Sequence, residues 1–200
     1  MKLVDIKEMT INVGVDQTDD RLKPTFDYLD QHGAHIGDQD GYPIYSAKYN
    51  ATTLYGVRVK DGTLVTVLVG NSIGDVFHLQ VIHTLQQYRN MNHAIRLVWF
   101  VKNQENKQII DYGAQTADGI KFVQALATSG RFTVLWYNLQ TKEKVRYSPE
   151  SDSADNAPYR GMQQTPWRIL IEGEQTPTFE RYATDQPGGA FGEPYHKLWK

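Results

Sequence analysis

The most apolar stretches of the chain are two short runs of similar sequence, spaced 37 residues apart. They are residues 97–100 (Leu-Val-Trp-Phe) and 134–137 (Val-Leu-Trp-Tyr), and each follows a segment with helical spacing. Strands that are apolar on both faces are normally covered on both faces. The pattern predicts two neighbouring buried strands at the centre of the core, each preceded by its own helix.

The first half of the chain has the pattern of a short helix followed by an antiparallel meander. Residues 8–15 alternate as a strand, and a helix near residues 24–33 leads into a polar loop at 34–41. Asp61-Gly62 is a strong hairpin signal. The three predicted meander strands are residues 42–49, 53–60 and 63–70.

Two longer helices are predicted in the middle of the chain. Residues 72–91 begin with Ser72 and Asp75 in a capping-box arrangement. Residues 109–130 have a helical apolar face, and Gly130 suits the position just after the last turn. The buried stripe of the first helix is predicted to be Val81, Ile82, Leu85 and Tyr88.

Short strands and irregular segments complete the pattern. Strands are predicted at residues 132–139, 144–147 and 167–171, and a polar loop at 148–165. The expected class is α+β, with a mixed, mostly antiparallel sheet that contains the meander and the Trp-containing strands, and two to three helices packed on it. Helix-to-strand crossovers are expected to add a parallel pair. We expect one domain over residues 1–175 and a C-terminal tail over residues 176–200.

Composition excludes several kinds of site. The 200-residue chain has no cysteine, which excludes a disulfide scaffold, a thiolate metal site and a cysteine nucleophile. Asp5 and Glu8 interrupt the N-terminus where a signal peptide needs an apolar run. No run approaches the ~18 apolar residues of a membrane span. These features predict a cytoplasmic, bacterial-type protein without a membrane partner.

Charge is unevenly distributed along the chain. Residues 1–50 carry 5 basic and 9 acidic side chains, residues 51–149 carry 11 and 6, and residues 150–200 carry 5 and 8. The basic centre contains no Lys/Arg run, whereas nucleic-acid binders usually have a concentrated basic surface. The distribution therefore argues against a nucleic-acid partner.

The densest group of potential metal ligands lies in residues 32–41. His32 and His35 are three positions apart, and Asp38 and Asp40 are two apart, among glycines that free the backbone. Imidazole and carboxylate ligands suit a divalent transition metal. The same residues are also typical of an ordinary turn after a helix. No cofactor is predicted apart from a divalent metal at this loop.

A second polar pair is expected on the helix predicted for residues 72–91. Asp75 and His78 share a face of a helix at i, i+3 and could form a carboxylate–imidazole pair that tunes a general base. A local stabilising contact near the helix N-terminus has the same signature.

The predicted order of residues 24–101 is similar to the core of restriction-endonuclease-like nucleases: a helix, a three-strand meander, a helix and a strand. That resemblance implies an acidic residue on the second meander strand and a Glu/Asp-x-Lys on the third. Residues 63–70 carry neither a carboxylate nor a lysine, so the resemblance implies no metal-dependent activity.

No motif identifies an activity, and the sequence does not decide whether the chain is an enzyme. The first hypothesis is a non-enzymatic binding protein with a protein partner or a second copy of itself. The alternatives are a small metal-assisted hydrolase that uses residues 32–41, and a nuclease-like fold without catalytic residues. The predicted interaction surface is the aromatic tail, which contains Phe179, Tyr182, Phe191, Tyr195 and Trp199.

Overall fold

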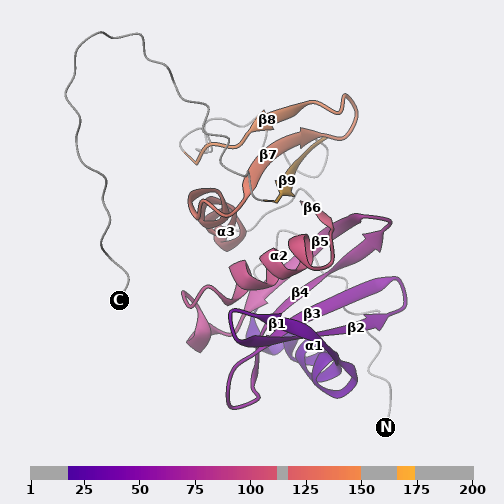
Figure 1. Cartoon of the computed structure of the whole chain (residues 1–200), viewed down its shortest axis with the longest axis vertical. Coiled ribbons are helices and arrows are strands. Elements are labelled where there is room, and N and C mark those ends of the chain that lie inside the picture. The colour runs from indigo at the N-terminus through magenta and orange to yellow at the C-terminus, as the bar shows by residue number, and fades with distance from the viewer. Residues whose placement is uncertain (1–17, 112–116, 150–165, 174–200) are drawn as a thin grey trace, which may run out of the picture.

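The computed structural model describes residues 18–111, 117–149 and 166–173. These residues form three α-helices and a nine-stranded mixed sheet, with the strands in the order β1-β2-β3-β4-β5-β6-β9-β7-β8 (Figure 1). The predicted α+β class, with a mostly antiparallel sheet and packed helices, is confirmed. The predicted strand at residues 8–15 and the whole C-terminal tail lie outside the described residues.

Helix α1 (Asp19–His32) confirms the helix predicted before Gly33. The Thr18 hydroxyl accepts the N–H of Arg21 at 3.4 Å, which satisfies one of the free donors at the helix start. Asp19 and Asp20 in the first turn favour the positive end of the helix dipole. The buried residues recur at helical spacing and face the sheet; they are Leu22, Thr25, Phe26 and Leu29.

Strands β2 (Tyr42–Tyr49), β3 (Thr52–Arg58) and β4 (Leu64–Ile73) confirm the predicted antiparallel meander. The segment predicted as a loop at 34–41 is instead strand β1 (Ala34–Gln39) and a tight turn. Asp40 and Gly41 take positive φ angles of 52° and 76°, which closes a two-residue hairpin to β2. The glycine and polar residues of this segment therefore belong to an edge strand and its hairpin turn, not to an irregular loop.

The helix predicted for residues 72–91 is wrong. Strand β4 runs to Ile73, Gly74 makes the turn with a φ of 59°, and strand β5 (Val76–Thr84) returns beside it. Beyond β5 there is only the 3-10 turn η2 (Gln86–Tyr88). Ser72 therefore lies on a strand and caps no helix.

A β-bulge in β5 explains why its sequence has the appearance of a helix. Val69 pairs with Val81 and Gly70 pairs with Leu79, so Gln80 is an extra residue on β5. Because of this extra residue, Leu79 and Val81 point to opposite faces of the sheet, although residues two apart on a regular strand share a face. Leu79 packs in the larger core cluster, whereas Val81 packs in the smaller one.

The buried strand predicted at residues 97–100 is also wrong, because these residues belong to helix α2 (His93–Asn103). The buried side chains include Leu97, Val98, Phe100 and Val101, a spacing that suits one face of a helix. The two Trp-containing runs are therefore not neighbouring strands. They do share the larger core cluster, which contains residues of both runs.

The second half of the sheet follows a parallel crossover. Helix α2 connects β5 to β6 (Gln108–Asp111), and these two strands are parallel. The sequence predicted a parallel pair between the two Trp-containing runs, whereas the observed pair joins segments that were predicted as helix. Helix α3 (Ala117–Thr128) ends before Gly130, as predicted, but it begins at Ala117, and residues 109–111, which were also predicted as helix, belong to β6. The strands after it are β7 (Thr133–Asn138), β8 (Lys144–Arg146) and β9 (Trp167–Glu172), and β9 lies between β6 and β7.

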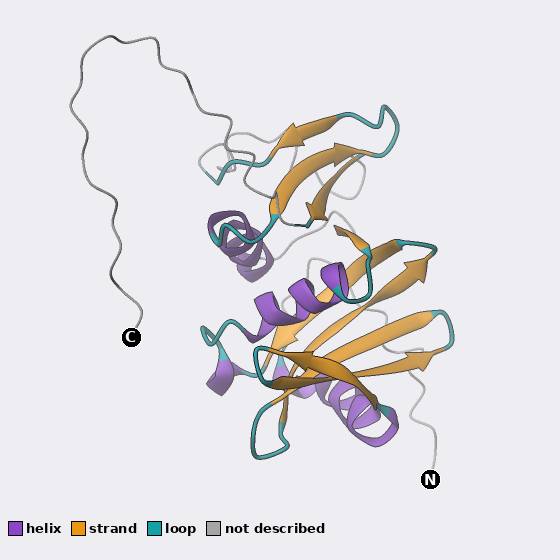
Figure 2. Cartoon of the chain, viewed as in Figure 1, coloured by secondary structure: helices purple, strands orange, loops and turns teal. Residues whose placement is uncertain are grey.

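Helices cover both faces of the sheet. Helix α1 packs against β2, β3 and β4 on one face, and α2 packs against β3, β4 and β5 on the other (Figures 1 and 2). Neighbouring residues of β4 therefore face opposite sides of the sheet. Leu68 belongs to the core cluster that contains residues of α2, and Val67 belongs to the one that contains residues of α1. In the described ranges, no helix is long and apolar enough to cross a membrane.

Candidate functional site

The carboxyl end of β5 carries a buried histidine paired with an aspartate from α1. His83 Nε2 lies 2.7 Å from Asp19 Oδ1, so the ring N–H donates to the carboxylate. The side chain of His83 is 5% exposed and that of Asp19 is 43% exposed. The carboxylate therefore faces solvent at the point where the first turn of α1 meets the end of β5.

The environment of Asp19 keeps it ionised. Burial raises the pKa of Asp19, but hydrogen bonds from His83 and from the backbone N–H of Gln86 outweigh it, so the pKa is lowered overall. The Gln86 N–H donates to Asp19 Oδ2 at 3.3 Å. One carboxylate thus holds both the end of β5 and the start of the loop that follows it.

That loop turns the chain from β5 into α2 through two left-handed asparagines. Asn90 and Asn92 have φ angles of 65° and 60°, a conformation that asparagine tolerates better than most residues. Asn92 occupies the N-cap position without a side-chain capping bond, and the first turn of α2 has no acidic residue. Intrahelical bonding begins with the Arg96 N–H to the Asn92 carbonyl at 3.0 Å. The start of α2 is an uncapped positive helix end.

The first residue of α2 is a buried histidine whose ring makes no hydrogen bond among the described residues. His93 is 2% exposed, and neither Nδ1 nor Nε2 has a partner there. Its ring packs edge-on against Tyr42 and Tyr88, with centroids 5.1 and 6.5 Å away. Burial, and secondarily the Arg96 charge, lower the pKa of His93, so its ring is neutral at pH 7. Buried polar atoms without partners are rare in folded proteins and call for a ligand, a water or a functional role.

Arginines surround this end of the sheet. Arg89 lies 3.4 Å from Asp118 in the first turn of α3, which brings the N-termini of α2 and α3 near the same loop. Arg96 and Arg131 approach Asp40 at 3.4 and 3.7 Å. Three arginines, each paired with an aspartate, therefore lie around this end of the sheet.

The sheet changes its pairing at the same end. The last parallel pair between β5 and β6 is Leu79 with Asp111, whereas β5 continues to Thr84 with β4 as its partner. The bulge at Gln80 comes immediately after that last pair. Among the described residues, the β6-facing edge of residues 80–84 has no strand partner.

A cavity of about 610 Å³ lies on the other side of Asp19, between α1 and the β3–β4 hairpin. Its apolar lining includes Phe26, Leu64 and Leu85. Two cations line it, and both are paired: Lys23 with Asp27 at 3.1 Å, and Arg58 with Asp30 at 2.7 Å. The carboxylates that line it are Asp19, Asp20, Asp27, Asp30 and Asp61.

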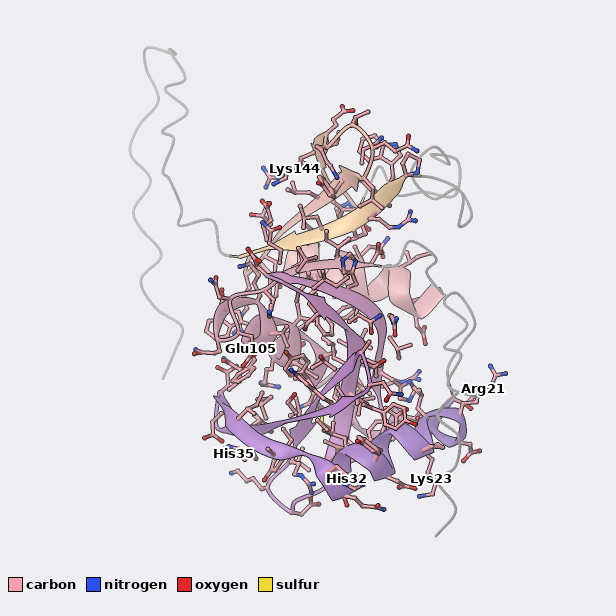
Figure 3. The ribbon with its side chains drawn as sticks, turned by 90° about the vertical axis from the view of Figure 1, so that its right-hand side faces the viewer. Arg21, Lys23, His32, His35, Glu105 and Lys144 are labelled. Atoms are coloured by element: carbon pink, nitrogen blue, oxygen red, sulfur yellow. The ribbon has the colours of Figure 1, made fainter. Side chains whose placement is uncertain are left out.

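The residues predicted as a metal site are separated in the structure. His32 ends α1 and stacks on Tyr28 at 4.5 Å, whereas His35 begins β1 and lies 3.4 Å from Asp38 (Figure 3). Asp40 faces the arginines described above. In the parts of the chain that are described, no group of three or more His, Asp or Glu side chains could hold a metal ion.

The predicted pair of Asp75 and His78 does not share a helical face, because these residues form a turn and a strand. The carbonyl of Asp75 accepts the Gln108 N–H at 2.7 Å, and His78 is paired with Ile110 across to β6. The tail residues from Phe179 to Trp199 lie outside the described residues, so the predicted protein partner or self-association stays a prediction.

Sequence reasoning missed the residues that the fold brings together at the carboxyl end of β5. Asp19 and His83 are 64 positions apart, and no local pattern connects them. A local signal did exist for the loop, since the two asparagines of Asn90-Met91-Asn92 favour left-handed turns before a helix.

Comparison with known proteins gave matches among solved structures only; no protein-family model and no curated protein matches the chain. One match is a protein proposed to be a GNAT-family acetyltransferase from Bacteroides thetaiotaomicron, with 8% identity, a TM-score of 0.36 and 62% of each chain covered. A second is proposed to be an acyl-CoA N-acyltransferase from Klebsiella pneumoniae, with 11% identity, a TM-score of 0.38, and 64% of this chain and 75% of that one covered. A third is a GNAT-family acetyltransferase from Staphylococcus aureus, with 13% identity, a TM-score of 0.37, and 84% and 86% covered.

These matches correct the functional hypotheses drawn from the sequence. The prediction of a non-enzymatic binding protein is wrong, since each matched structure is named as an acyl- or acetyltransferase. The hydrolase alternative also loses its physical basis, because its metal ligands do not meet in the described residues. The nuclease-like alternative required a helix before a strand in residues 72–101, and the order there is the reverse.

Proposed function

We propose that the chain transfers an acyl group from an acyl-coenzyme A thioester to an amine. The observation that carries this proposal is the uncapped N-terminus of α2 at the carboxyl end of β5, where β5 and β6 part. The support comes from the geometry of this chain, since the TM-scores of the matched structures stay below 0.5.

The start of α2 suits the diphosphate of coenzyme A. Helix N-termini bind phosphate because free N–H groups and the helix dipole both favour an anion. Asn92 leaves this end without a side-chain cap, and the first turn has no carboxylate to repel an anion. Arg89, which is paired with Asp118, lies in the loop before this end, and the ring of His93, which has no hydrogen-bond partner among the described residues, adds polar atoms that need one.

The open edge of β5 suits the extended arm that carries the thioester. An extended chain can add to an exposed strand edge through main-chain hydrogen bonds. Residues 80–84 present such an edge beside the α2 N-terminus. A diphosphate at the helix start would therefore direct the arm along β5 towards the bulge at Gln80.

The bulge suits the chemical step. Bulges often lie beside active sites, where they redirect backbone groups. The amine attacks the thioester carbonyl carbon, and negative charge develops on the carbonyl oxygen. Backbone N–H groups on the open edge can donate to that oxygen and stabilise the transition state. The C–S bond then breaks, and the thiolate takes up the proton that the amine loses.

A charge change at the helix start tests the proposal. Asn92→Asp places a carboxylate beside the proposed diphosphate, and we expect coenzyme A affinity to fall about tenfold, measured by calorimetry. Asn106→Asp is the matched control, because Asn106 also has a positive φ of 51° but lies at the far end of α2. Equal affinity in both variants, or no binding to the unmodified chain, would contradict the proposal.

A further inference from the structure

Resting on that proposed function, we infer that His93 binds a proton when the diphosphate of coenzyme A occupies the start of α2, and that the charged ring then helps to hold the diphosphate. His93 is the first residue of α2 and is 2% exposed. Neither ring nitrogen has a hydrogen-bond partner among the described residues. A buried group that can change its charge therefore lies where the proposed anion binds.

The surroundings of His93 oppose a positive charge on the ring in the free chain. Tyr42 of β2 and Tyr88 of η2 pack against it edge-on. Arg96 follows three positions later on the same helix, and the positive end of the helix dipole lies at the same place. Burial first, and then the charge of Arg96, lower the pKa of His93.

The carboxylate beside Arg96 is shared between two arginines. Asp40, in the β1–β2 turn, lies 3.4 Å from Arg96 and 3.7 Å from Arg131. The guanidinium of Arg96 also lies 4.6 Å from the centre of the Tyr42 ring. The first turn of α2 has no acidic residue. Among the described residues, nothing that contacts the His93 ring supplies a negative charge, so an anion from solution would be the first to do so.

A diphosphate at the start of α2 would reverse this balance. Nearby negative charge stabilises an imidazolium, and it also offsets the charge of Arg96 and the helix dipole. The pKa of His93 would therefore rise on binding. A protonated imidazole has two N–H donors, so both ring nitrogens could then donate hydrogen bonds.

The coupling between the proton and the anion is reciprocal. A ligand that raises the pKa of a group binds more tightly when that group is protonated. Well above the pKa of the bound state the ring is neutral with or without ligand, and the extra affinity is absent. The affinity increases as pH falls through the bound pKa, and it stops increasing below the lower pKa of the free chain.

Calorimetry with dephospho-coenzyme A at pH 8.0 and pH 5.5 tests the coupling on the full chain. This probe keeps the diphosphate but lacks the 3′-phosphate, a monoester whose own second pKa of about 6 would confuse the measurement. We expect its affinity to be about fivefold higher at pH 5.5, the result of a rise of about one unit in the pKa of His93.

Two variants assign the effect to one histidine. In His93→Gln the affinity should change less than about twofold between the two pH values, because the titrating ring is gone. The matched control His35→Gln removes an exposed histidine on β1 and should behave like the unmodified chain. An equal pH dependence in His93→Gln would overturn the inference.

Proton NMR of the His93 ring tests the inference on the unmodified chain, so it does not depend on the folding of a variant. We expect the pKa of the ring to be about one unit higher with saturating dephospho-coenzyme A than without it. An unchanged pKa at saturation would overturn the inference.

The outcomes separate this inference from the proposed function. Binding with neither a pH dependence nor a change in the ring would overturn the role of His93 and leave acyl transfer standing. Proton-linked binding without release of thiol from acetyl-coenzyme A in the presence of amines would support the role of His93 and overturn acyl transfer. No binding at either pH would overturn both.

Discussion

At the scale of single residues, polar groups with unusual surroundings identify the candidate site. His93 is buried without a hydrogen-bond partner among the described residues, and Asp19 joins α1 to the end of β5 through His83 and Gln86. The ligand-type side chains that stand out in the sequence are instead exposed, His32 at the end of α1 and His35 and Asp38 on the edge strand β1. Burial and partners, which depend on the fold, distinguish the two groups.

His93 should make stability depend on pH. Its folded pKa lies below its ordinary value of 6.5, so the unfolded chain binds a proton more readily as pH falls through 6.5. The stabilising contribution of the neutral ring is complete above pH 6.5 and is lost on acidification below it. The lowered pKa of Asp19 acts only below its ordinary value of 3.8, outside this range.

Urea unfolding at pH 7.5 and pH 5.5 measures this effect. We expect His93→Gln to lose less stability than the unmodified chain between the two pH values. His35→Gln, at an exposed position, should behave like the unmodified chain. An identical pH dependence in all three proteins would contradict the assignment to His93.

At the scale of elements, the sequence predicted the meander and the end of α3 correctly. It predicted β5 as part of a helix and α2 as a strand. The bulge at Gln80 breaks the period-two pattern of β5, so Val81, Ile82 and Leu85 take on helical spacing. Residues 95–101 are rich in branched and aromatic side chains, and a short buried apolar run cannot be assigned by periodicity alone. The class was still predicted correctly, because exchanging one strand and one helix leaves the overall pattern α+β.

The bulge depends on a glycine in the facing strand. A Cβ on Gly70 would lie 2.3 Å from the His78 carbonyl oxygen and 2.6 Å from the Phe77 ring. We expect Gly70→Ala to lower the free energy of unfolding by about 1–3 kcal/mol, measured in urea. In Gly173→Ala the new Cβ meets side-chain atoms of Asn103 and Lys102 at 3.3 Å or more, so a change below about 0.5 kcal/mol is expected. Equal effects would mean that the bulge does not require glycine.

At the scale of the whole molecule, one edge of the fold gathers the features on which the proposed acyl transfer depends. The carboxyl end of β5 and the starts of α2 and α3 meet around Asp19 and the loop after β5. The site could not be predicted from the sequence, because residues from position 19 to position 118 meet only after the sheet forms. Ligands of open sheets commonly bind at such carboxyl ends, where the strands part.

The central claim is that the start of α2 binds the diphosphate of coenzyme A, and backbone amide NMR with coenzyme A titration tests it most directly. We expect the largest, saturable shifts at the amides of residues 93–95 and in the loop from Arg89 to Asn92, with smaller shifts on β5. Adenosine without phosphate should leave these amides unshifted. Shifts confined to other elements, or none at saturating coenzyme A, would contradict the account.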